Sequence, residues 1–441
     1  MASFTRFFVA LAFCVSLFTV VTSSPAFGAK AGKTVSLPVA HNADLPRHGP
    51  TDYLRTLKKY KLKIPDGLQE VVDAHKATHR KAVDAEIGGS APASSRDGDL
   101  LWITPVSIGE PPQELFLDLD TGSSDTWLFS TDTDKKGVAG QTLWDPSKSS
   151  TAHLVQNCSW SIIYGDFSTS EGICYRDTIS FGNLSIANMT IESATEVSSM
   201  FTDSAYMSGL VGLAWPSIIQ TVPPQKGLLD FLPQTLSQPV FTVDLRHNSS
   251  DGTFNFGYID DSLHGDQVEY VDVDTTDGFW TVSHKGFSIG GSEIKYEFNE
   301  AREVIIDTGS TLFFAPDEAV STYFDSVPGA NYSYRDYGWV IPCNSTPPDF
   351  IYELGDAAGN TVTGSIPGAY FVYAHTSNEL CYAGIQSLGS FSEMQGIFGD
   401  IFLKSGFAVF DIANRKFGMA PKLLNTNNNK REKKAGDEGR S

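Results

Sequence analysis

The chain is short of basic residues. Its 441 residues include 32 Lys and Arg against 52 Asp and Glu, so the formal net charge at pH 7 is −20. The deficit lies in one stretch: residues 98–421 hold 13 basic and 41 acidic residues, whereas residues 30–97 hold 12 and 8. Because such an acidic body would repel phosphate, we expect no nucleic-acid partner.

Long apolar runs are also lacking, apart from Phe7–Val21 behind Arg6. This run with small residues after it is typical of a secretory signal peptide, which we place at residues 1–28, with Ser23 or Ser24 as alternative cleavage positions. The alternative is a membrane anchor, but the run is shorter than the roughly 20 residues of a spanning helix. We therefore expect no membrane anchor, and delivery to the extracellular space or the vacuole. Sequons for N-glycosylation, which are compatible with secretion, begin at Asn183, Asn188, Asn248, Asn331 and Asn344.

Cysteine is scarce, and one of the five, Cys14, lies in the signal peptide. An even remaining set in an exported chain favours two disulfides. Spacing favours Cys158–Cys174 and Cys343–Cys381, although the sequence permits three pairings. No Cys-x-x-Cys pair or cluster of His accompanies them, so we expect no metal and no other cofactor.

The body of the chain has the pattern of short strands. Apolar stretches alternate with turns rich in Gly and Pro, and helix signals are brief. We expect an all-β body with an N-terminal lobe at 98–268, a C-terminal lobe at 269–421 and a polar, disordered tail at 422–441. Strands are expected at 113–120, 159–164, 171–181, 239–246, 253–258, 302–307 and 405–411, and a short helix at 316–326.

Residues 29–97, in front of the body, are interpreted as a propeptide. Helices are expected over 51–60 and 67–83, followed by a flexible connector suited to processing. The close lysines at 58, 59, 61 and 63 would cover an acidic cleft until acid protonates its carboxylates. A solvated linker without that function is the alternative.

An internal repeat is the most informative feature of the sequence. Asp118–Ser124 reads Asp-Leu-Asp-Thr-Gly-Ser-Ser, and Ile305–Thr311 reads Ile-Ile-Asp-Thr-Gly-Ser-Thr. Each copy is followed by a second similar motif, two apolar residues and a Gly, at 210–213 and 397–400. One Asp-Thr-Gly alone would be an ordinary turn. Two copies in similar settings indicate a duplication with a site where the halves meet.

Two such loops brought together explain a hydrolytic chemistry. Two close carboxyl groups in a cleft cannot both ionise cheaply, so Asp120 and Asp307 would share one proton. The ionised group would activate a water molecule as general base, and the protonated group would polarise a carbonyl. Neither a Ser or Cys nucleophile nor a metal is needed.

The ordered motifs between about 100 and 421 resemble the pepsin-like aspartic endopeptidases, most of all the secreted fungal members. Besides the two Asp-Thr-Gly-Ser segments, Tyr164-Gly165-Asp166 and Gly396–Asp400 match that family. The resemblance implies two pseudo-symmetric β lobes with an active-site cleft between them. It also implies a zymogen whose propeptide is an intramolecular inhibitor, extended peptide or protein substrates, and a monomer.

The resemblance implies roles for individual residues. Asp120 and Asp307 would be the catalytic pair. Supporting roles would fall to Thr121, Ser123, Thr308, Ser310, Tyr164 and Trp127: the threonines brace the loops, the serines bond the carboxylates, and Trp127 supports the hydroxyl of Tyr164 on a flap. Substrate would contact Gly122, Gly165, Asp166, Leu210 and Gly309.

Two departures from the family pattern concern the flap. Phe167 stands where fungal members usually have Gly, and a bulky residue does not readily take a positive φ. Cys158 and Cys174 flank the flap, so a disulfide there would restrict it. Two alternative functions are a non-catalytic binding protein on the same fold, which would usually have lost a motif residue, and a two-carboxylate carbohydrate enzyme, which needs no duplicated Asp-Thr-Gly.

Overall fold

The computed structural model describes residues 32–41, 47–86, 102–164, 167–202, 207–247, 249, 252–292, 295–389 and 394–423. All described residues belong to one compact unit within Gly32–Ser441. The predicted signal peptide, the connector before residue 102 and most of the predicted tail lie outside the described residues. So do Gly165, Asp166 and Asn248.

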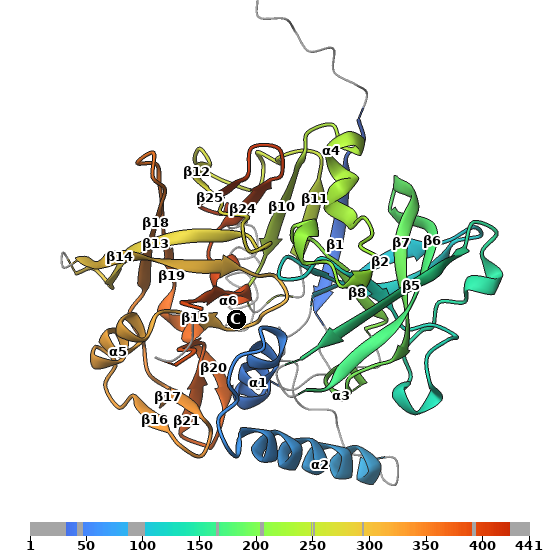
Figure 1. Cartoon of the computed structure of the whole chain (residues 1–441). Coiled ribbons are helices and arrows are strands. Elements are labelled where there is room, and N and C mark those ends of the chain that lie inside the picture. Colours follow the sequence, from blue (N-terminus) through green and yellow to red (C-terminus); the bar gives the residue numbers. More distant parts are fainter. Residues whose placement is uncertain are drawn as a thin grey trace, which may run out of the picture. The chain divides into compact units, whose positions relative to one another are not determined.

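Within the described residues the strands form sheets of 14, seven and four strands (Figure 1). The first has the order β12 (Glu269–Asp272), β25 (Lys416–Ala420), β24 (Phe407–Asp411), β10 (Val240–Leu245), β11 (Gly252–Phe256), β1 (Val35–His41), β2 (Trp102–Ile108), β3 (Gln113–Asp120), β8 (Gly209–Gly212), β4 (Thr126–Leu128), β7 (Leu184–Glu196), β6 (Thr169–Phe181), β5 (His153–Ile163) and β9 (Thr221–Val222). The second has the order β19 (Thr361–Ile366), β18 (Phe350–Gly355), β13 (Thr281–Ile289), β14 (Lys295–Ile306), β23 (Ile397–Phe398), β15 (Phe313–Phe314) and β22 (Ile385–Gln386). The third has the order β16 (Asn331–Ser333), β17 (Gly338–Pro342), β21 (Leu380–Ala383) and β20 (Val372–His375).

Helices are few and mostly short among the described residues. They are α1 (Gly49–Lys59), α2 (Leu68–Glu86), α3 (Ser199–Thr202), α4 (Leu232–Thr235), α5 (Asp317–Asp325) and α6 (Asp400–Leu403). The all-β, two-lobed architecture expected from the sequence is confirmed, and each expected strand overlaps an observed one. β14 begins earlier than predicted, at Lys295, because its first half is mostly exposed and polar and so lacks an apolar signal.

The two halves of the repeat have the same local topology. β3 runs parallel to β8, with Asp120 opposite Gly212. In the other half β14 runs parallel to β23, with Ile306 opposite Phe398. Each Asp-Thr-Gly loop therefore leaves the end of one strand beside an apolar-apolar-Gly strand, which is the physical meaning of the repeated motif.

A core of large aromatic side chains supports both loops. The rings of Phe241 and Phe410 stack with centroids 4.5 Å apart, and Trp280 packs edge-on against both. The Trp280 indole N–H donates to the carbonyl of Leu213 at 2.8 Å, and its own carbonyl accepts from the N–H of Ile306 at 3.0 Å. One buried side chain thus links the strands next to both loops.

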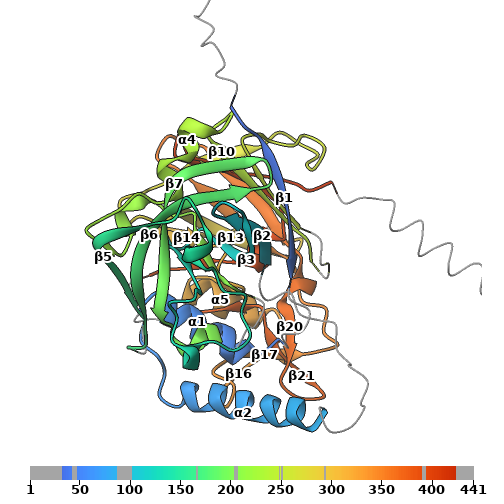
Figure 2. The same cartoon turned by 90° about the vertical axis from the view of Figure 1, so that its right-hand side faces the viewer.

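The segment in front of residue 98 folds onto the body. β1 pairs with both β11 and β2, and its alternate residues Val35, Leu37 and Val39 are buried. Figures 1 and 2 show α1 against the body and α2 near the β16–β21 end of it, where the Tyr337 hydroxyl donates to the carbonyl of Asp66 at 2.6 Å. The helices predicted at 51–60 and 67–83 match α1 and α2, whereas β1 was not predicted.

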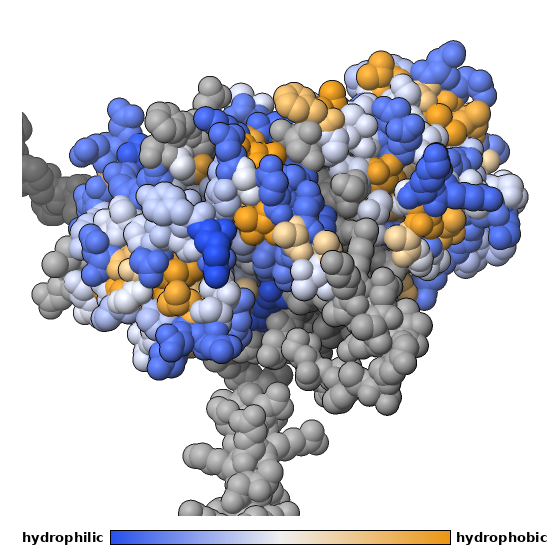
Figure 3. Space-filling model, turned by 90° about the horizontal axis from the view of Figure 1, so that it is seen from below, coloured by the Kyte–Doolittle hydropathy of each residue, from blue (hydrophilic) through white to orange (hydrophobic). Residues whose placement is uncertain are grey.

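The end of the described chain differs from the expected tail. The described chain continues to Leu423, and the side chain of Lys422, which we assigned to the tail, is only 7% exposed, with its amino group 3.2 Å from Asp244 Oδ1. No helix among the described residues combines the length and hydrophobicity required to cross a bilayer. The coloured part of the face in Figure 3 is largely hydrophilic with small, separate hydrophobic clusters.

Candidate active site

The side chains of Asp120 and Asp307 are held by matching hydrogen bonds. Asp120 accepts from the N–H of Gly122 at 2.8 Å and from the hydroxyl of Ser123 at 2.6 Å. Asp307 accepts from the N–H of Gly309 at 2.9 Å and from the hydroxyl of Ser310 at 2.6 Å. The two carboxyl groups are therefore oriented in the same way by residues two and three positions further along.

The two threonines tie the loops together. The Thr121 hydroxyl donates to the carbonyl of Ile306 at 2.9 Å and accepts from the N–H of Thr308 at the same distance. The Thr308 hydroxyl donates to the carbonyl of Leu119 at 2.6 Å and accepts from the N–H of Thr121 at 3.0 Å. All four hydrogen bonds are buried, so this reciprocal network fixes the distance between the loops.

The two glycines are required by close approach across the site. A Cβ on Gly122 would lie 2.5 Å from Asp307 Oδ1, and a Cβ on Gly309 would lie 2.3 Å from Asp120 Oδ1. Both distances are shorter than any side-chain contact permits. Any other residue at either position would push the opposite carboxyl group away.

The two carboxyl groups differ in their electrostatics. Asp120 is 1% exposed and Asp307 0% exposed. Burial raises the pKa of Asp120 above its usual range, with Lys59 opposing and Asp307 adding to the rise. Burial also acts to raise the pKa of Asp307, but Lys59 and the Ser310 hydroxyl outweigh it and hold that pKa below its usual range. Divergent pKa values are expected of two carboxyl groups in one desolvated site.

Lys59 and Tyr60, at the end of α1, occupy the space between the two carboxyl groups. Lys59 Nζ lies 2.7 Å from Asp120 Oδ1 and 2.9 Å from Asp307 Oδ1. The Tyr60 hydroxyl donates to Asp307 Oδ2 at 2.8 Å. Desolvation disfavours the charge on Lys59, but the two carboxylates outweigh it and raise the pKa of Lys59. The amino group is therefore a cation held by both aspartates.

A cavity of about 350 Å³ surrounds this point. Its walls include Trp127, Tyr164 and Leu210, as well as Lys59 and Tyr60 from the segment in front of the body. Leu210 is opposite Asp118 in the β3–β8 pairing, so both face the region next to the Asp120 loop. Tyr164 and Trp127 both pack on Phe201, at ring distances of 5.6 and 5.0 Å.

The β5–β6 hairpin carries Tyr164 over the cavity. Its ladder ends at the pair Ile163–Thr169, and the N–H of Phe167 donates to the carbonyl of Tyr164 at 2.9 Å. Phe167 has a φ of +63° and is 88% exposed. The bulky residue that replaces Gly therefore takes the left-handed conformation, with its ring in solvent.

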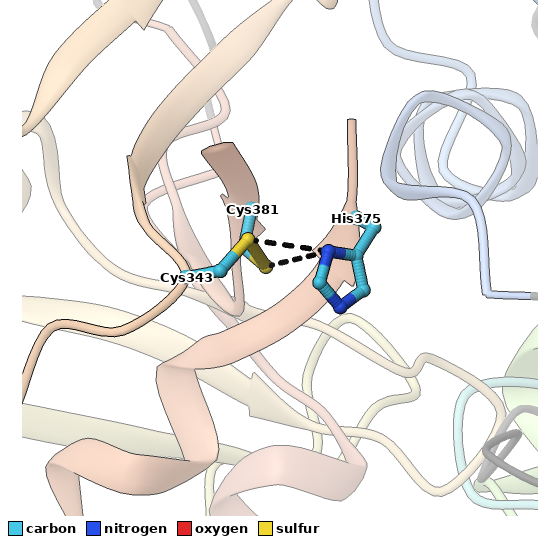
Figure 4. Close-up of side chains that lie close together, drawn as sticks. All are labelled: Cys343, His375 and Cys381. Carbon is cyan, nitrogen blue, oxygen red and sulfur yellow. Dashed lines mark hydrogen bonds between the residues drawn. A yellow bond between two sulfur atoms is a disulfide. The ribbon is translucent and has the colours of Figure 1, made fainter. Parts of the chain in front are cut away.

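Both predicted disulfides are present. Cys158–Cys174 links β5 to β6 near the base of the hairpin. Cys343–Cys381 lies in the other half, with His375 Nδ1 at 3.3 Å from the sulfur of Cys343 (Figure 4). Among the described residues this is the one cluster of three atoms of metal-ligand type. Because its sulfurs are bonded to each other, they are not the thiolates that bind metals.

Sequence reasoning did not identify every residue at this site. It named Lys59 only as one of four lysines, and it overlooked Tyr60, although Tyr60 directly follows two of them. Asp118 lies two residues before Asp120 and is 5% exposed, and burial raises its pKa well above the usual range. Its equivalent in the second repeat is Ile305, so comparing the two copies would have marked Asp118 as unusual.

Sequence comparison finds similar proteins over most of this chain. The sequence profile of the family described as eukaryotic aspartyl protease matches residues 101–422. The chain is 39% identical over 396 residues to endothiapepsin from Cryphonectria parasitica, which covers 89% of this chain and 90% of that protein. It is 37% identical over 386 residues to aspartic protease pepA from Arthroderma gypseum (85% and 89%) and 37% identical over 403 residues to podosporapepsin from Podospora anserina (89% and 91%).

Proposed function

Because this chain belongs to the eukaryotic aspartyl protease family, we propose that it is an acid endopeptidase that uses a water molecule held between Asp120 and Asp307. The observation that carries the proposal is the position of Lys59 Nζ, within 2.9 Å of both carboxyl groups. A small polar group can therefore contact both aspartates at once. Water would take that place once Lys59 has left.

Once Lys59 has left, the two buried carboxyl groups would share one proton, and the chemistry follows from that division. The water attacks the peptide carbonyl while the ionised aspartate removes a proton from it. The protonated aspartate donates a hydrogen bond to the carbonyl oxygen. The proton gained by the first then passes to the leaving amine. The Ser123 and Ser310 hydroxyls and the Gly122 and Gly309 N–H groups support this division by holding each carboxyl group in place.

Substrate would bind as an extended peptide along the cavity. Backbone groups of the flap and of Gly309 would add hydrogen bonds as in strand addition. Leu210 and Trp127 would provide apolar surface for a large side chain before the cleaved bond. Gly165 and Asp166 are assigned to substrate contact on the resemblance of their motif, and Tyr164 to closing the flap.

The segment in front of the body would inhibit the enzyme as a propeptide. Lys59 occupies the place of the water, and the Tyr60 hydroxyl donates a hydrogen bond to the second carboxylate oxygen of Asp307. As pH falls, protonation of the carboxyl groups removes the charges that hold Lys59, so the segment would dissociate and be cleaved. The expected flexible connector would provide the cleavage position.

The chain is proposed to be secreted, to the extracellular space or the vacuole. The predicted signal peptide and the two disulfides support this. The sequon residues Asn183, Asn188, Asn331 and Asn344 are at least partly exposed and accessible for glycosylation. We expect the enzyme to act as a monomer.

The test is acid activation of the purified full chain. At about pH 3–4 the wild type should lose its propeptide and cleave denatured protein, and a statine-type peptide should block cleavage. Asp120→Asn, with its propeptide removed by tagged wild-type enzyme that is then withdrawn, should be inactive. A wild type that loses its propeptide but cleaves no protein would favour a non-catalytic binding protein.

A further inference from the structure

A second pair of buried acidic side chains lies beside the catalytic loop. Asp125 ends the loop that begins at Asp120, and Glu192 lies on β7; they are 3% and 0% exposed. Glu192 is opposite Trp127, two residues after Asp125, in the β4–β7 pairing, and each carboxyl group acts on the pKa of the other. Both Glu192 oxygens are buried without a hydrogen-bond partner in the described structure. The chemistry described above makes no use of this pair.

The surroundings of the pair contain no compensating cation among the described residues. Trp127 of β4 and Cys174 of β6 are opposite Glu192 in the sheet, and Cys174 is bound in a disulfide. Asp125 is the one titratable group of the described chain that acts on Glu192, and Glu192 is the one that acts on Asp125. Burial and then Asp125 raise the pKa of Glu192 well above its usual range, and burial raises the pKa of Asp125 to about 6.

Two carboxylates without a cation cannot both remain charged in a desolvated site. One of them must keep a proton, which then lies in the hydrogen bond between them. The backbone N–H of Gln220 donates to Asp125 Oδ1 at 2.7 Å and lowers the pKa of Asp125. The Thr126 N–H acts in the same direction on Glu192, but burial and Asp125 outweigh it, and neither Glu192 oxygen has a hydrogen-bond partner in the described structure. Asp125 is therefore the better acceptor and Glu192 the better proton holder.

Asp125 in turn connects the catalytic strand to the cavity wall. Its carbonyl accepts from the N–H of Gly212 at 2.9 Å, and Gly212 is opposite Asp120 in the β3–β8 pairing. Its side chain holds Gln220, which lines the cavity together with Ile218. A change in the charge of the pair would therefore reach both the Asp120 loop and the wall that contacts substrate.

We propose that Glu192 is a positioning residue that donates its proton to Asp125 and so holds the cavity wall against the Asp120 loop. The inference deepens the proposed function, since it concerns the same active site. In acid the pair carries at least one proton, so its stabilisation is complete at low pH and is lost as pH rises through the raised pKa of the pair. Loss of that proton places two charges in the core, loosens the wall and ends activity independently of the aspartates that hold the water.

The test compares Glu192→Gln with Glu196→Gln. The amide that replaces the Glu192 carboxyl group can donate to Asp125 and has no proton to lose, while Glu196 is exposed on the same strand and undergoes the same change. The melting temperature of the full chain is measured from pH 5 to pH 7.5, and the difference between each variant and the wild type is followed. The melting temperature of Glu192→Gln should rise relative to that of the wild type as pH rises, whereas Glu196→Gln should follow the wild type at every pH.

A second arm measures activity after acid activation. Each enzyme is held at pH 7 for one hour, returned to pH 4 and assayed, so that Asp120 and Asp307 have the same protonation in every assay. A wild-type enzyme whose cavity wall loosens at pH 7 should unfold during the hour and not recover at pH 4. The wild type should therefore lose most of its activity, and Glu192→Gln should keep most of it. Equal losses in the two enzymes would overturn the proposal.

A third measurement keeps the proposal testable if Glu192→Gln does not fold. Wild-type protein with ¹³C-labelled glutamate should show the infrared carbonyl band of a protonated carboxylic acid at pH 6, where ordinary glutamates are ionised. Absence of the band would overturn the proposal. If the activated wild type cleaves no peptide, the proposed function fails, while the melting and infrared results still decide the role of Glu192.

Discussion

On the activation proposed above, Lys59→Met should let the full chain lose its propeptide at a higher pH than the wild type. The amino group of Lys59 lies 2.7 Å from Asp120 Oδ1 and 2.9 Å from Asp307 Oδ1, and only 16% of its side chain is exposed. Methionine keeps the length and the apolar stem of the side chain and removes the charge. The substitution therefore tests the ion pairs with little change in packing.

The magnitude follows from those distances. Each contact amounts to about 6 kcal/mol of gross attraction at an effective dielectric constant of about 20. Desolvation of the three groups offsets most of this, and removing one partner of a buried pair costs about 3–5 kcal/mol. Because the aspartates left behind can take up a proton, we use the lower end of this range, about 3 kcal/mol. This energy corresponds to about a hundredfold increase in the fraction of molecules from which the segment carrying residue 59 has dissociated. The carboxylate charges that hold Lys59 are lost as pH falls. A segment that is bound more weakly, as in Lys59→Met, needs less protonation to dissociate and therefore dissociates at a higher pH.

The assay follows propeptide loss by intact mass and peptide cleavage at half-unit steps from pH 3 to pH 7. Lys59→Met should reach half-activation about one pH unit or more above the wild type. Lys63→Met is the matched control, because Lys63 is exposed and belongs to the same lysine cluster. The reasoning is refuted if Lys59→Met activates at the wild-type pH, or if Lys63→Met shifts the midpoint equally.

Three further predictions concern groups outside the catalytic pair. The stacked rings of His48 and His75 lie 3.7 Å apart, and burial and then His75 lower the pKa of His48 to about 4. Charging His48 in acid would therefore weaken this contact between the start of α1 and α2. His75→Gln should then slow propeptide loss near pH 4, and an unchanged rate would contradict this. Burial lowers the pKa of His284 to about 3, so the fold loses stability as pH falls from about 6.5 toward 3, at up to about 1.4 kcal/mol per unit of pKa shift. His284→Leu should reduce the drop in melting temperature between pH 7 and pH 4, whereas a larger drop would speak against the buried neutral ring. Phe167→Gly should leave the zymogen equally stable or up to about 1 kcal/mol more stable in urea unfolding, since glycine takes a φ of +63° without penalty and the exposed ring packs on little. A loss of more than about 1 kcal/mol would show that the ring has a packing role.

The catalytic loops were predictable because the information is local and repeated. Asp120 and Asp307 each end an apolar strand, and the residues that bind their carboxyl groups follow within three positions. The strands were predictable for a similar reason, since short apolar stretches recur between turns rich in Gly and Pro. The observed bounds of a strand differ from the predicted ones where part of the strand is exposed, as in the first half of β14.

What the sequence could not predict depends on distant pairing and burial. β1 joins the body's sheet through β11, which lies more than 200 residues away, and the isolated stretch Val35–His41 does not reveal its partner. Which of the four lysines reaches the aspartates depends on where α1 ends. Asp125 and Glu192 look like ordinary surface acids until the structure buries them against each other.

The central claim is that Asp120 and Asp307 act as one catalytic unit. The most direct measurement is kcat/KM at about pH 4 for Asp120→Asn and Asp307→Asn after propeptide removal, beside Asp325→Asn, an exposed aspartate of α5. Because proton transfer by a positioned group contributes about 10²–10⁴-fold, each of these two variants should lose at least about 10²-fold when the pair is broken, and Asp325→Asn should match the wild type. Activity within tenfold of the wild type in either catalytic variant would contradict the account.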